Sequence, residues 1–362
     1  MQHKREMAAA ASPGLLKRAY PFLRPLFQLA LAGGLLAALL LRVDRAAVRE
    51  QIGEADLIWL PLALAATIAS QWFRAIRWRH LLLPLRRMSV RFLFASNLIG
   101  VVGNIALPLR AGEILRIQVV RGRSRLSVSS IVATVLSEKL VDVVVFSVFI
   151  VGGLLLFEEA RFLWPLGVAY GVVVSVGVSG ALYLARRVER QGEQAGSPAG
   201  GRLRAWLARE LHHFARGFQS FRRPGALFHI TWSACAAWLC EALMYYAFGR
   251  ALGLDLSPGV YLLLVVTATI AVSVPITQAG FGVFELAIAG LLIAFGVNEA
   301  KAAAFAIFAH ALPALTYIVS GPMAAFALRL SLPDILFLRK PNAVREDTRA
   351  LEVAAGEPAA GS

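Results

Sequence analysis

Charged side chains inside long apolar segments are the residues of this sequence with the clearest chemical potential. Glu138 and Asp142 lie four residues apart, and therefore on one helix face, within the apolar segment 127–157. Glu241 and Glu285 lie in later apolar segments. A charge at the centre of a bilayer costs about 2.5–3.5 kcal/mol on insertion scales, so each acid needs a partner, a polar cavity or a function.

Pairing between helices explains each of these acids when it is taken alone, and contact with a substrate explains it equally well. A group of such residues that converges on one cavity favours the substrate role. His310, near Pro313 in the last apolar segment, is a weaker candidate of the same kind.

Two segments share an order of residue types. One runs from Asn104 to Glu113 with Arg116 after it, and the other runs from Ser273 to Glu285. Each has a proline, a polar residue, small residues and then a glutamate, within a short hydrophobic stretch. Corresponding interrupted helices in two halves of a chain are the best sequence indication of a transporter's site. Proline breaks a helix, and the N-terminus of a half-helix favours an anion such as phosphate.

Recognisable catalytic signatures are absent from the sequence. It has no Gly-x-x-x-x-Gly-Lys-Ser/Thr, His-Glu-x-x-His, Gly-x-Ser-x-Gly or Asp-x-Asp pattern. Its two cysteines, Cys235 and Cys240, are too few for a zinc site and are interpreted as packing residues. We therefore expect a protein that is not an enzyme and that uses no cofactor and no metal.

The composition indicates a membrane protein. Residues AVILMFWYC form 58% of the 362 residues, charged residues form 16%, and the mean hydropathy is +0.66. Ordinary globular domains are about 45–50% apolar and about 25% charged. The net charge of +15 comes from basic residues that flank apolar segments without a recognisable nucleic-acid motif, so nucleic acid is not expected as a partner. We predict an all-α, polytopic transmembrane helical bundle.

About seven to nine hydrophobic segments approach the roughly 20 residues that cross a bilayer. Lys and Arg concentrate before the first segment, on both sides of the third, and between the fifth and sixth. The positive-inside rule assigns these gaps, and with them both chain termini, to the cytoplasm. The apolar segments are 25–41, 57–73, 92–109, 127–157, 162–185, 226–249, 259–276, 279–296 and 302–328.

Segment 92–109 is predicted to be a re-entrant hairpin, because the gaps on both of its sides are basic. Gly100, Gly103, Asn104 and Pro108 suit a broken element inside it. The alternative is a full span with one misassigned loop. Segments 259–276 and 279–296 are either two short spans or a second re-entrant pair that enters from outside.

The remaining regions are predicted to be cytoplasmic. Residues 1–24 form a basic N-terminus, and 331–362 form a polar tail that is expected to be disordered. The basic loop 186–225 contains a segment, 202–223, with apolar residues at helical spacing between arginines. We expect an amphipathic helix there, which lies on an anionic leaflet or packs on the protein's own helices.

Four motifs in order resemble the lysylphosphatidylglycerol synthase transmembrane-region family of flippase-like membrane proteins, over roughly residues 30–330. They are Arg74-Ala-Ile-Arg-Trp-Arg-His-Leu-Leu, Pro-x-Arg-x-Gly-Glu-x-x-Arg ending at Arg116, Ser-Glu138-Lys-Leu-Val-Asp142, and the turn from Pro275 to Glu285. Lys139 stands where the family has Arg, and Gln278-Ala279 stands where it has Pro-Gly. The second departure makes that turn less constrained.

The resemblance implies a flippase-like domain over 25–330, without a synthase domain after position 340 and so without aminoacyl-transferase activity. It implies movement of a lipid or lipid-linked molecule between leaflets. Members have been associated with aminoacylated phospholipids, hopanoid-type lipids and polyprenyl-linked sugars. We predict a multi-pass translocase of the bacterial inner membrane for an anionic or aminoacylated lipid.

In the predicted mechanism Arg110, Arg116 and helix-end amides hold a phosphate. Acidic residues hold these arginines in place or contact a cationic head group. The predicted substrate-binding residues are Arg74, Arg77, Asn104, Arg110, Gly112, Glu113, Arg116, Glu138, Asp142, Gln278, Gly280, Gly282 and Glu285.

Two other classes of function stay open. The protein could be an accessory or scaffold subunit that holds a lipid for a partner enzyme of envelope synthesis. It could also be a membrane transferase that uses a polyprenyl phosphate, although the missing metal motif argues against this class.

Overall fold

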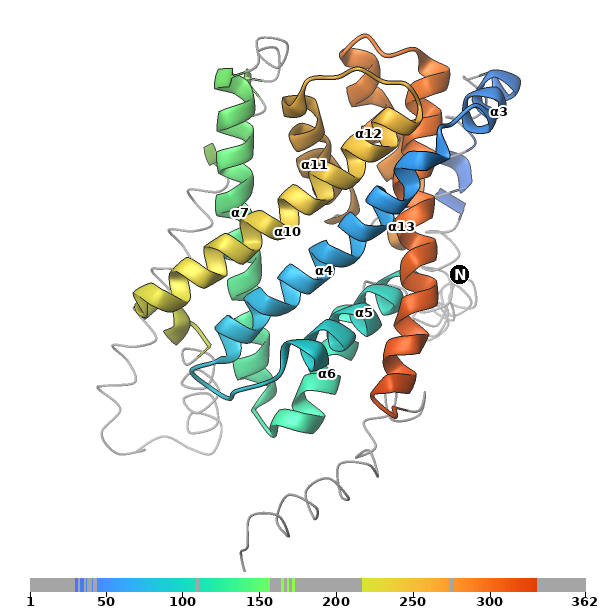
Figure 1. Ribbon diagram of the computed structural model, residues 1–362. Helices are drawn as coiled ribbons and strands as arrows, with labels where there is room; N and C mark the ends of the chain where they lie inside the picture. The colour runs from blue at the N-terminus through green and yellow to red at the C-terminus, as the bar shows by residue number, and fades with distance from the viewer. Residues whose placement is uncertain are drawn as a thin grey trace, which may run out of the picture.

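The computed structural model describes residues 44–107, 111–156, 217–273 and 277–330, with a few single residues between 30 and 41 and between 164 and 172. Every regular element in this part of the chain is helical, which confirms the predicted all-α class (Figure 1). The predictions for the N-terminus 1–24, for the tail 331–362 and for all but the last residues of the amphipathic segment 202–223 lie outside the described residues.

Helix α4 (Leu60–Leu82) runs through the middle of the contacts between helices. It packs against α10 (Pro224–Ala251), α5, α7 and α13. It follows α3 (Arg45–Gly53) and the short η1 (Leu57–Trp59), and the chain bends by 65° between α3 and α4. The helix continues past the predicted end at residue 73, because its basic residues are good helix formers and find acidic partners on other helices.

Helices α5 (Val90–Ala106) and α6 (Gly112–Ser124) form an antiparallel hairpin, which we call the first hairpin. Arg123 lies over the ring of Phe92 at one end of the pair, and Arg116 bonds Asn97 further along. The returning arm of the hairpin is thus 112–124. The predicted break at Gly100, Gly103 and Asn104 is wrong, because α5 is continuous through them, and the helix ends at Ala106, shortly before Pro108.

The glycines of α5 serve close packing instead of breaking the helix. A Cβ atom on Gly103 would lie 2.8 Å from the Cα of Gly112, and one on Gly100 would lie 3.1 Å from the Cβ of Arg116. Small residues let two helix backbones approach in this way in membrane proteins.

A second hairpin is formed by α11 (Pro258–Ser273) and α12 (Val283–Ala294), which pack together and are joined through the short η5 (Gln278–Gly280). Their 16 and 12 residues give helices of about 24 and 18 Å, shorter than a hydrocarbon core of about 30 Å. This supports the re-entrant pair over two short spans. Gly280 and Gly282 have φ values of 84° and 81°, a conformation that glycine adopts without strain.

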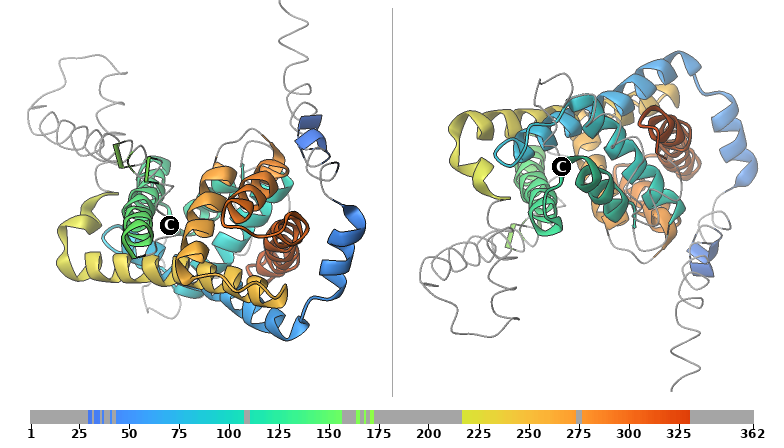
Figure 2. Two further views of the ribbon diagram at one scale, coloured as in Figure 1. Left: turned by 90° about the horizontal axis from the view of Figure 1, so that it is seen from above. Right: turned by 90° about the horizontal axis from the view of Figure 1, so that it is seen from below.

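Longer helices surround the two hairpins. α7 (Val128–Leu156), α10 and α13 (Glu299–Ala327) have 28 or 29 residues each. Of the described helices, α10 and α13 are long and apolar enough to cross a membrane, and the bent pair of α3 and α4 is a third candidate. Figure 2 shows α7 on one side of the hairpins and α13 on the other, while α4 and α10 run along one face.

Exposed arginines gather at one end of the bundle. The C-terminal ends of α4 and α6 and the N-terminal ends of α5 and α10 meet, since Arg86 bonds the carbonyl of Ser124 and Ser220 bonds the carbonyl of Leu81. The exposed charged residues of this end are all arginines: Arg79, Arg86, Arg87, Arg91, Arg121, Arg123, Arg125 and Arg223. The structure thus brings these arginine-rich loops to one end of the bundle, and their cytoplasmic position stays a prediction.

Candidate functional site

A stripe of polar side chains on α4 organises the site. Ser70, Gln71, Arg74, Arg77 and Trp78 recur at steps of three and four residues and therefore face the same side of the helix. All but Arg74 are buried or nearly so, and each reaches a partner on another helix or on α4 itself. The stripe turns the centre of an apolar span into a polar surface.

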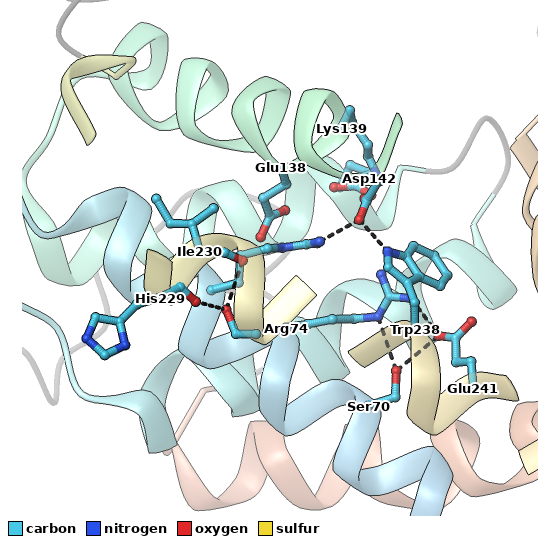
Figure 3. A network of polar contacts seen from close by, with 12 residues as sticks. Ser70, Arg74, Glu138, Lys139, Asp142, His229, Ile230, Trp238 and Glu241 are labelled. Carbon is cyan, nitrogen blue, oxygen red and sulfur yellow. Dashed lines mark hydrogen bonds and ion pairs between the residues drawn. The ribbon is translucent and has the colours of Figure 1, made fainter. Parts of the chain in front are cut away.

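Arg77 and Asp142 form a buried ion pair between α4 and α7. Arg77 Nη1 donates to Asp142 Oδ1 at 2.5 Å, and only 2% of the surface of Arg77 is exposed. The indole Nε1 of Trp238 on α10 donates to the same oxygen at 2.6 Å (Figure 3). One carboxylate thus joins three helices, and charge-assisted bonds of this kind are about twice as strong as neutral ones.

Arg74 and Glu241 form a second pair, between α4 and α10. Arg74 Nη2 donates to Glu241 Oε1 at 2.5 Å, and Ser70 Oγ donates to the same oxygen at 3.1 Å (Figure 3). The guanidinium of Arg74 lies 3.9 Å from the ring centroid of Trp238. Trp238 therefore contacts both pairs, through its N–H in one case and through its π face in the other.

Arg116 anchors the first hairpin to α7. It donates to Glu138 at 2.7 Å, to Glu113 at 2.6 Å and to Asn97 at 3.2 Å. Its guanidinium also lies 4.7 Å from the ring centroid of Trp78. The guanidinium of Arg116 thus bonds three side chains from three helices, which fixes α6 against α5 and α7.

Lys139 and Glu113 form the open edge of this arrangement. Lys139 Nζ is 3.8 Å from Glu113 Oε1, and 52% of the Lys139 side chain is exposed. The eight charged side chains of these ion pairs, which we call the central network, comprise four positive and four negative charges and are neutral as a whole. They are Arg74, Arg77, Arg116, Lys139, Glu113, Glu138, Asp142 and Glu241.

Neutrality decides what the network can do with a charged ligand. Removing one partner of a buried ion pair costs about 3–5 kcal/mol, because the other charge is left uncompensated. A phosphate or an ammonium group can therefore enter only by exchanging with a charge that is already present. Glu138 Oε1 and Asn97 Nδ2 are buried and have no hydrogen-bond partner within the described residues, so the network also has spare polar atoms next to Arg116.

The second hairpin carries a different pair. Glu285, 3% exposed, accepts from the backbone N–H of Gly282 at 2.6 Å with one oxygen and lies 2.6 Å from His310 Nδ1 with the other. The imidazole stacks on Phe281 and packs on Phe284, with centroid separations of 4.5 and 4.6 Å. We call these two residues the Glu285–His310 pair.

The structure brings part of the predicted site together. Six of the thirteen predicted residues join the central network: Arg74, Arg77, Glu113, Arg116, Glu138 and Asp142. Asn104 and Gly112 pack against each other near the tip of the first hairpin. Arg110 and the side chain of Gln278 lie outside the described residues.

The second hairpin departs from the prediction. Gly280 and Gly282 shape its turn, and Glu285 pairs with His310. The two oxygens of Glu285 face Gly282 and His310 and pair with no arginine of the described residues, so contact with a cationic head group is the predicted role that stays open. Substrate binding by any of the thirteen residues stays a prediction.

Several site residues were not predicted from the sequence. Trp78 and Trp238 pack on arginines, and Asn97 completes the shell of Arg116. The polar stripe of α4 was a usable signal, because Ser70 and Gln71 precede Arg74 at helical spacing inside an apolar segment. Tryptophan in a membrane helix gives no such signal, since it is also common where helices meet the membrane–water interface.

Comparison with known proteins places the chain in a family. It is 26% identical over 332 residues to "Glycosyltransferase AglD" of Haloferax volcanii, which covers 82% of this chain and 53% of that protein, so the chain spans about half the length of this relative. Two "UPF0104 membrane protein" sequences of Methanothermobacter thermautotrophicus are 25% and 23% identical over 74% and 75% of this chain, and over 85% and 84% of their own lengths. No solved structure matches. The model of the lysylphosphatidylglycerol synthase TM region family matches residues 26–321, and the chain belongs to this family of membrane proteins.

Proposed function

We propose that this protein moves the polar head group of a lipid or lipid-linked molecule between the two leaflets of the cell's inner membrane, in which it is a multi-pass protein. The central network carries this proposal. Ionisable residues at membrane depth are costly and typically line the pathway of a substrate or ion. Here they come from α4, α6, α7 and α10, and they meet inside the bundle instead of facing lipid.

The two hairpins supply the pathway in this proposal. The first begins at the arginine-rich end of the bundle, and the second begins at the opposite end, where Gly253 after α10 approaches Lys301 near the start of α13. The tip of the second, η5, contacts α5 of the first. Broken helices that meet between two halves of a transporter form the site of its substrate.

Exchange of ion pairs is the proposed mechanism. A lipid phosphate replaces a carboxylate at Arg116, and the released carboxylate pairs with a cationic part of the head group or with Lys139. The exchange starts at the open edge, because Lys139 and Glu113 are the more exposed members there. The acyl chains stay in the bilayer, so only the head group crosses the polar interior.

A second candidate function is supported by one relative. The similarity to a protein named a glycosyltransferase covers 82% of this chain but only 53% of that protein. A chain of this kind could present a lipid-linked sugar to a catalytic domain, either as an accessory subunit or as part of an enzyme. In that case the network binds a lipid head group without moving it across the membrane.

Reconstitution of the purified protein in vesicles separates the two functions. The vesicles contain phosphatidylglycerol with a fluorescent head group, and a membrane-impermeant quencher reports how fast inner-leaflet lipid reaches the outer leaflet. We expect Arg116→Ala and Glu241→Gln to slow this movement about 10- to 100-fold, since a hydrogen bond to a charged group contributes about 1.5–3 kcal/mol. Arg250→Ala and Glu299→Gln make the same changes at exposed positions and should leave the rate unchanged.

The outcomes are distinct. Equal rates for Arg116→Ala, Glu241→Gln and the wild type would refute translocation through the central network. Retention of a head group by the pure protein without any movement, together with turnover of a labelled lipid-linked sugar donor once a partner enzyme is added, would support the accessory function instead.

A further inference from the structure

The contacts of the Glu285–His310 pair fix which imidazole nitrogen faces the carboxylate. One carboxylate oxygen of Glu285 accepts the backbone N–H of Gly282, and the other faces His310 Nδ1, so an ionised carboxylate requires the proton of a neutral imidazole to sit on Nδ1. Nε2 then carries a lone pair. Within the described residues no group forms a hydrogen bond with Nε2. This nitrogen is also not one of the fully buried side-chain atoms that lack a partner, so it has some accessible surface. The pair thus holds an oriented imidazole with one free, reachable nitrogen.

The charge of the pair distinguishes it from the central network. With a neutral imidazole and an ionised Glu285 the pair carries one negative charge, and among the described residues only the N–H dipoles at the start of α12 balance it. A proton taken up at Nε2 makes the pair neutral, as an imidazolium beside a carboxylate. An uncompensated charge away from water is costly, so the two charge states of the pair differ in how the apolar surroundings accommodate them.

Other titratable groups do not compensate this charge. None on the elements packed against α12 and α13 forms a hydrogen bond or an ion pair with Glu285 or His310 in the part of the chain that the structure describes. These groups are Arg91 on α5, Tyr261 on α11, Glu299, Lys301 and Tyr317 on α13, Arg45, Arg49 and Glu50 on α3, Arg74, Arg77, Arg79 and His80 on α4, and His229, Cys235, Cys240, Glu241, Tyr245, Tyr246 and Arg250 on α10.

The pair is placed where its charge can affect the hairpin. The bond from Gly282 to the Glu285 carboxylate holds the first turn of α12, and a positive charge on His310 competes with the Gly282 N–H for the charge of the same carboxylate. Two turns further along α13, Tyr317 accepts a hydrogen bond from Gln71 of the α4 stripe at 3.1 Å. Pro313 lies between His310 and Tyr317 and leaves one carbonyl of α13 without its helical partner, which gives this helix a point of bending.

We propose that the Glu285–His310 pair is a proton-binding site, and that uptake and release of a proton at His310 Nε2 drive the movement of the second hairpin during lipid translocation. The inference rests on the proposed function, to which it adds an energy source. The proton comes from the water on one side of the membrane and leaves to the other, and no other reactant is needed.

Vesicles with a pH difference across the membrane test this site. One coupled proton and a difference of one pH unit correspond to an up to about tenfold change in the leaflet distribution of the transported lipid. With the reconstituted protein and fluorescent phosphatidylglycerol, we expect the wild type to show this shift and His310→Gln to show none. His229→Gln, the same change at an exposed histidine on α10, should keep the full shift. A full shift in His310→Gln overturns the inference and leaves the proposed function standing.

A measurement without lipid transport keeps the two claims separate. The difference in unfolding temperature between the wild type and His310→Gln should change between about pH 5 and pH 8, the range in which histidine side chains usually titrate. His229→Gln measures the pH dependence that an exposed histidine contributes, and its curve should differ from that of His310→Gln. If this pH-dependent difference is present but no lipid moves, the proposed function fails and the proton site stands. If the His310→Gln difference is constant over this range, the proton site is overturned.

Discussion

The two hairpins of this protein use one backbone device for two kinds of chemistry. Both have two short helices, and in both small residues allow a tight turn or a close approach. The first hairpin contributes Arg116, which is held by two carboxylates and an amide in a network without net charge. The second contributes Glu285, whose partner is a histidine.

The difference shows what a pattern of Pro, Gly and Glu does and does not specify. The pattern predicts where the chain turns, because proline and glycine act on the backbone. The chemistry depends on which side chains the surrounding helices place beside the glutamate. α7 places Glu138 beside Arg116 and Lys139 beside Glu113 of the first hairpin, whereas α13 places an imidazole beside Glu285 of the second. One region is therefore suited to pairing and exchanging charges, and the other to changing its charge.

The largest effect is expected at the centre of the network. Asp142→Asn leaves the buried guanidinium of Arg77 without its counter-charge and should cost about 3–5 kcal/mol in the free energy of unfolding. Thermal or denaturant unfolding in detergent measures the loss, and Asp255→Asn, at a residue that is 99% exposed, is the matched control. If Arg77→Leu and Asp142→Leu together restore no stability relative to Asp142→Asn, uncompensated charge is not the cause.

A nearly equal effect is expected at the closest approach of α5 and α6. Gly112→Leu puts a side chain where the carbonyl of Gly100 and the amide of Asn104 lie, so the helices must separate at a cost of about 3 kcal/mol or more. Gly122→Ala, on the same helix with open space around it, should be neutral or up to about 1 kcal/mol stabilising. Similar yields of folded protein from the two variants would show that the hairpin does not pack as described.

A smaller loss of stability is expected in the second hairpin. The amide in Glu285→Gln can still accept from the Gly282 N–H and bond His310, so the cost should be about 1–2 kcal/mol, less than that of Asp142→Asn. The same unfolding assay compares the two variants. A cost for Glu285→Gln as large as that for Asp142→Asn would mean that both hairpins serve mainly to balance charge, and the contrast between them would disappear.

The smallest effect is expected at the rim. Arg250 and Asp255 are 3.6 Å apart and solvent-exposed, so Arg250→Ala should change the free energy of unfolding by less than about 0.5 kcal/mol. A larger loss, measured in the same way, would have to come from the contact between Arg250 and Trp59.

Much of the fold could be predicted from the sequence, because it follows from local rules. Apolar length and the distribution of arginine indicate the membrane class and the arginine-rich end. The break of the first hairpin was wrongly assigned to Gly100 and Gly103, since glycines can break a helix or pack it, and only the presence of α6 decides between these roles. The helix over 112–124 was not predicted, because its arginines favoured the assignment of this segment to a loop.

The membership of the site was predictable in part. The charges of Arg77, Asp142 and Glu138 are costly in lipid, so the sequence alone requires partners for them. Which partner each one takes depends on the rotation of α4 against α7 and α10, and no local pattern encodes this. Trp238 and Asn97 entered the site for the same reason, as neighbours that only the packing of the helices reveals.

The most direct test of the central network removes one of its ion pairs without changing its net charge. The double variant Arg77→Gln/Asp142→Asn keeps polar side chains of similar size, so a folded protein can be compared in the vesicle assay with the rim double variant Arg250→Gln/Asp255→Asn. We expect the first to have lost lipid movement and the second to move lipid like the wild type. Wild-type movement in a folded Arg77→Gln/Asp142→Asn protein would contradict the account.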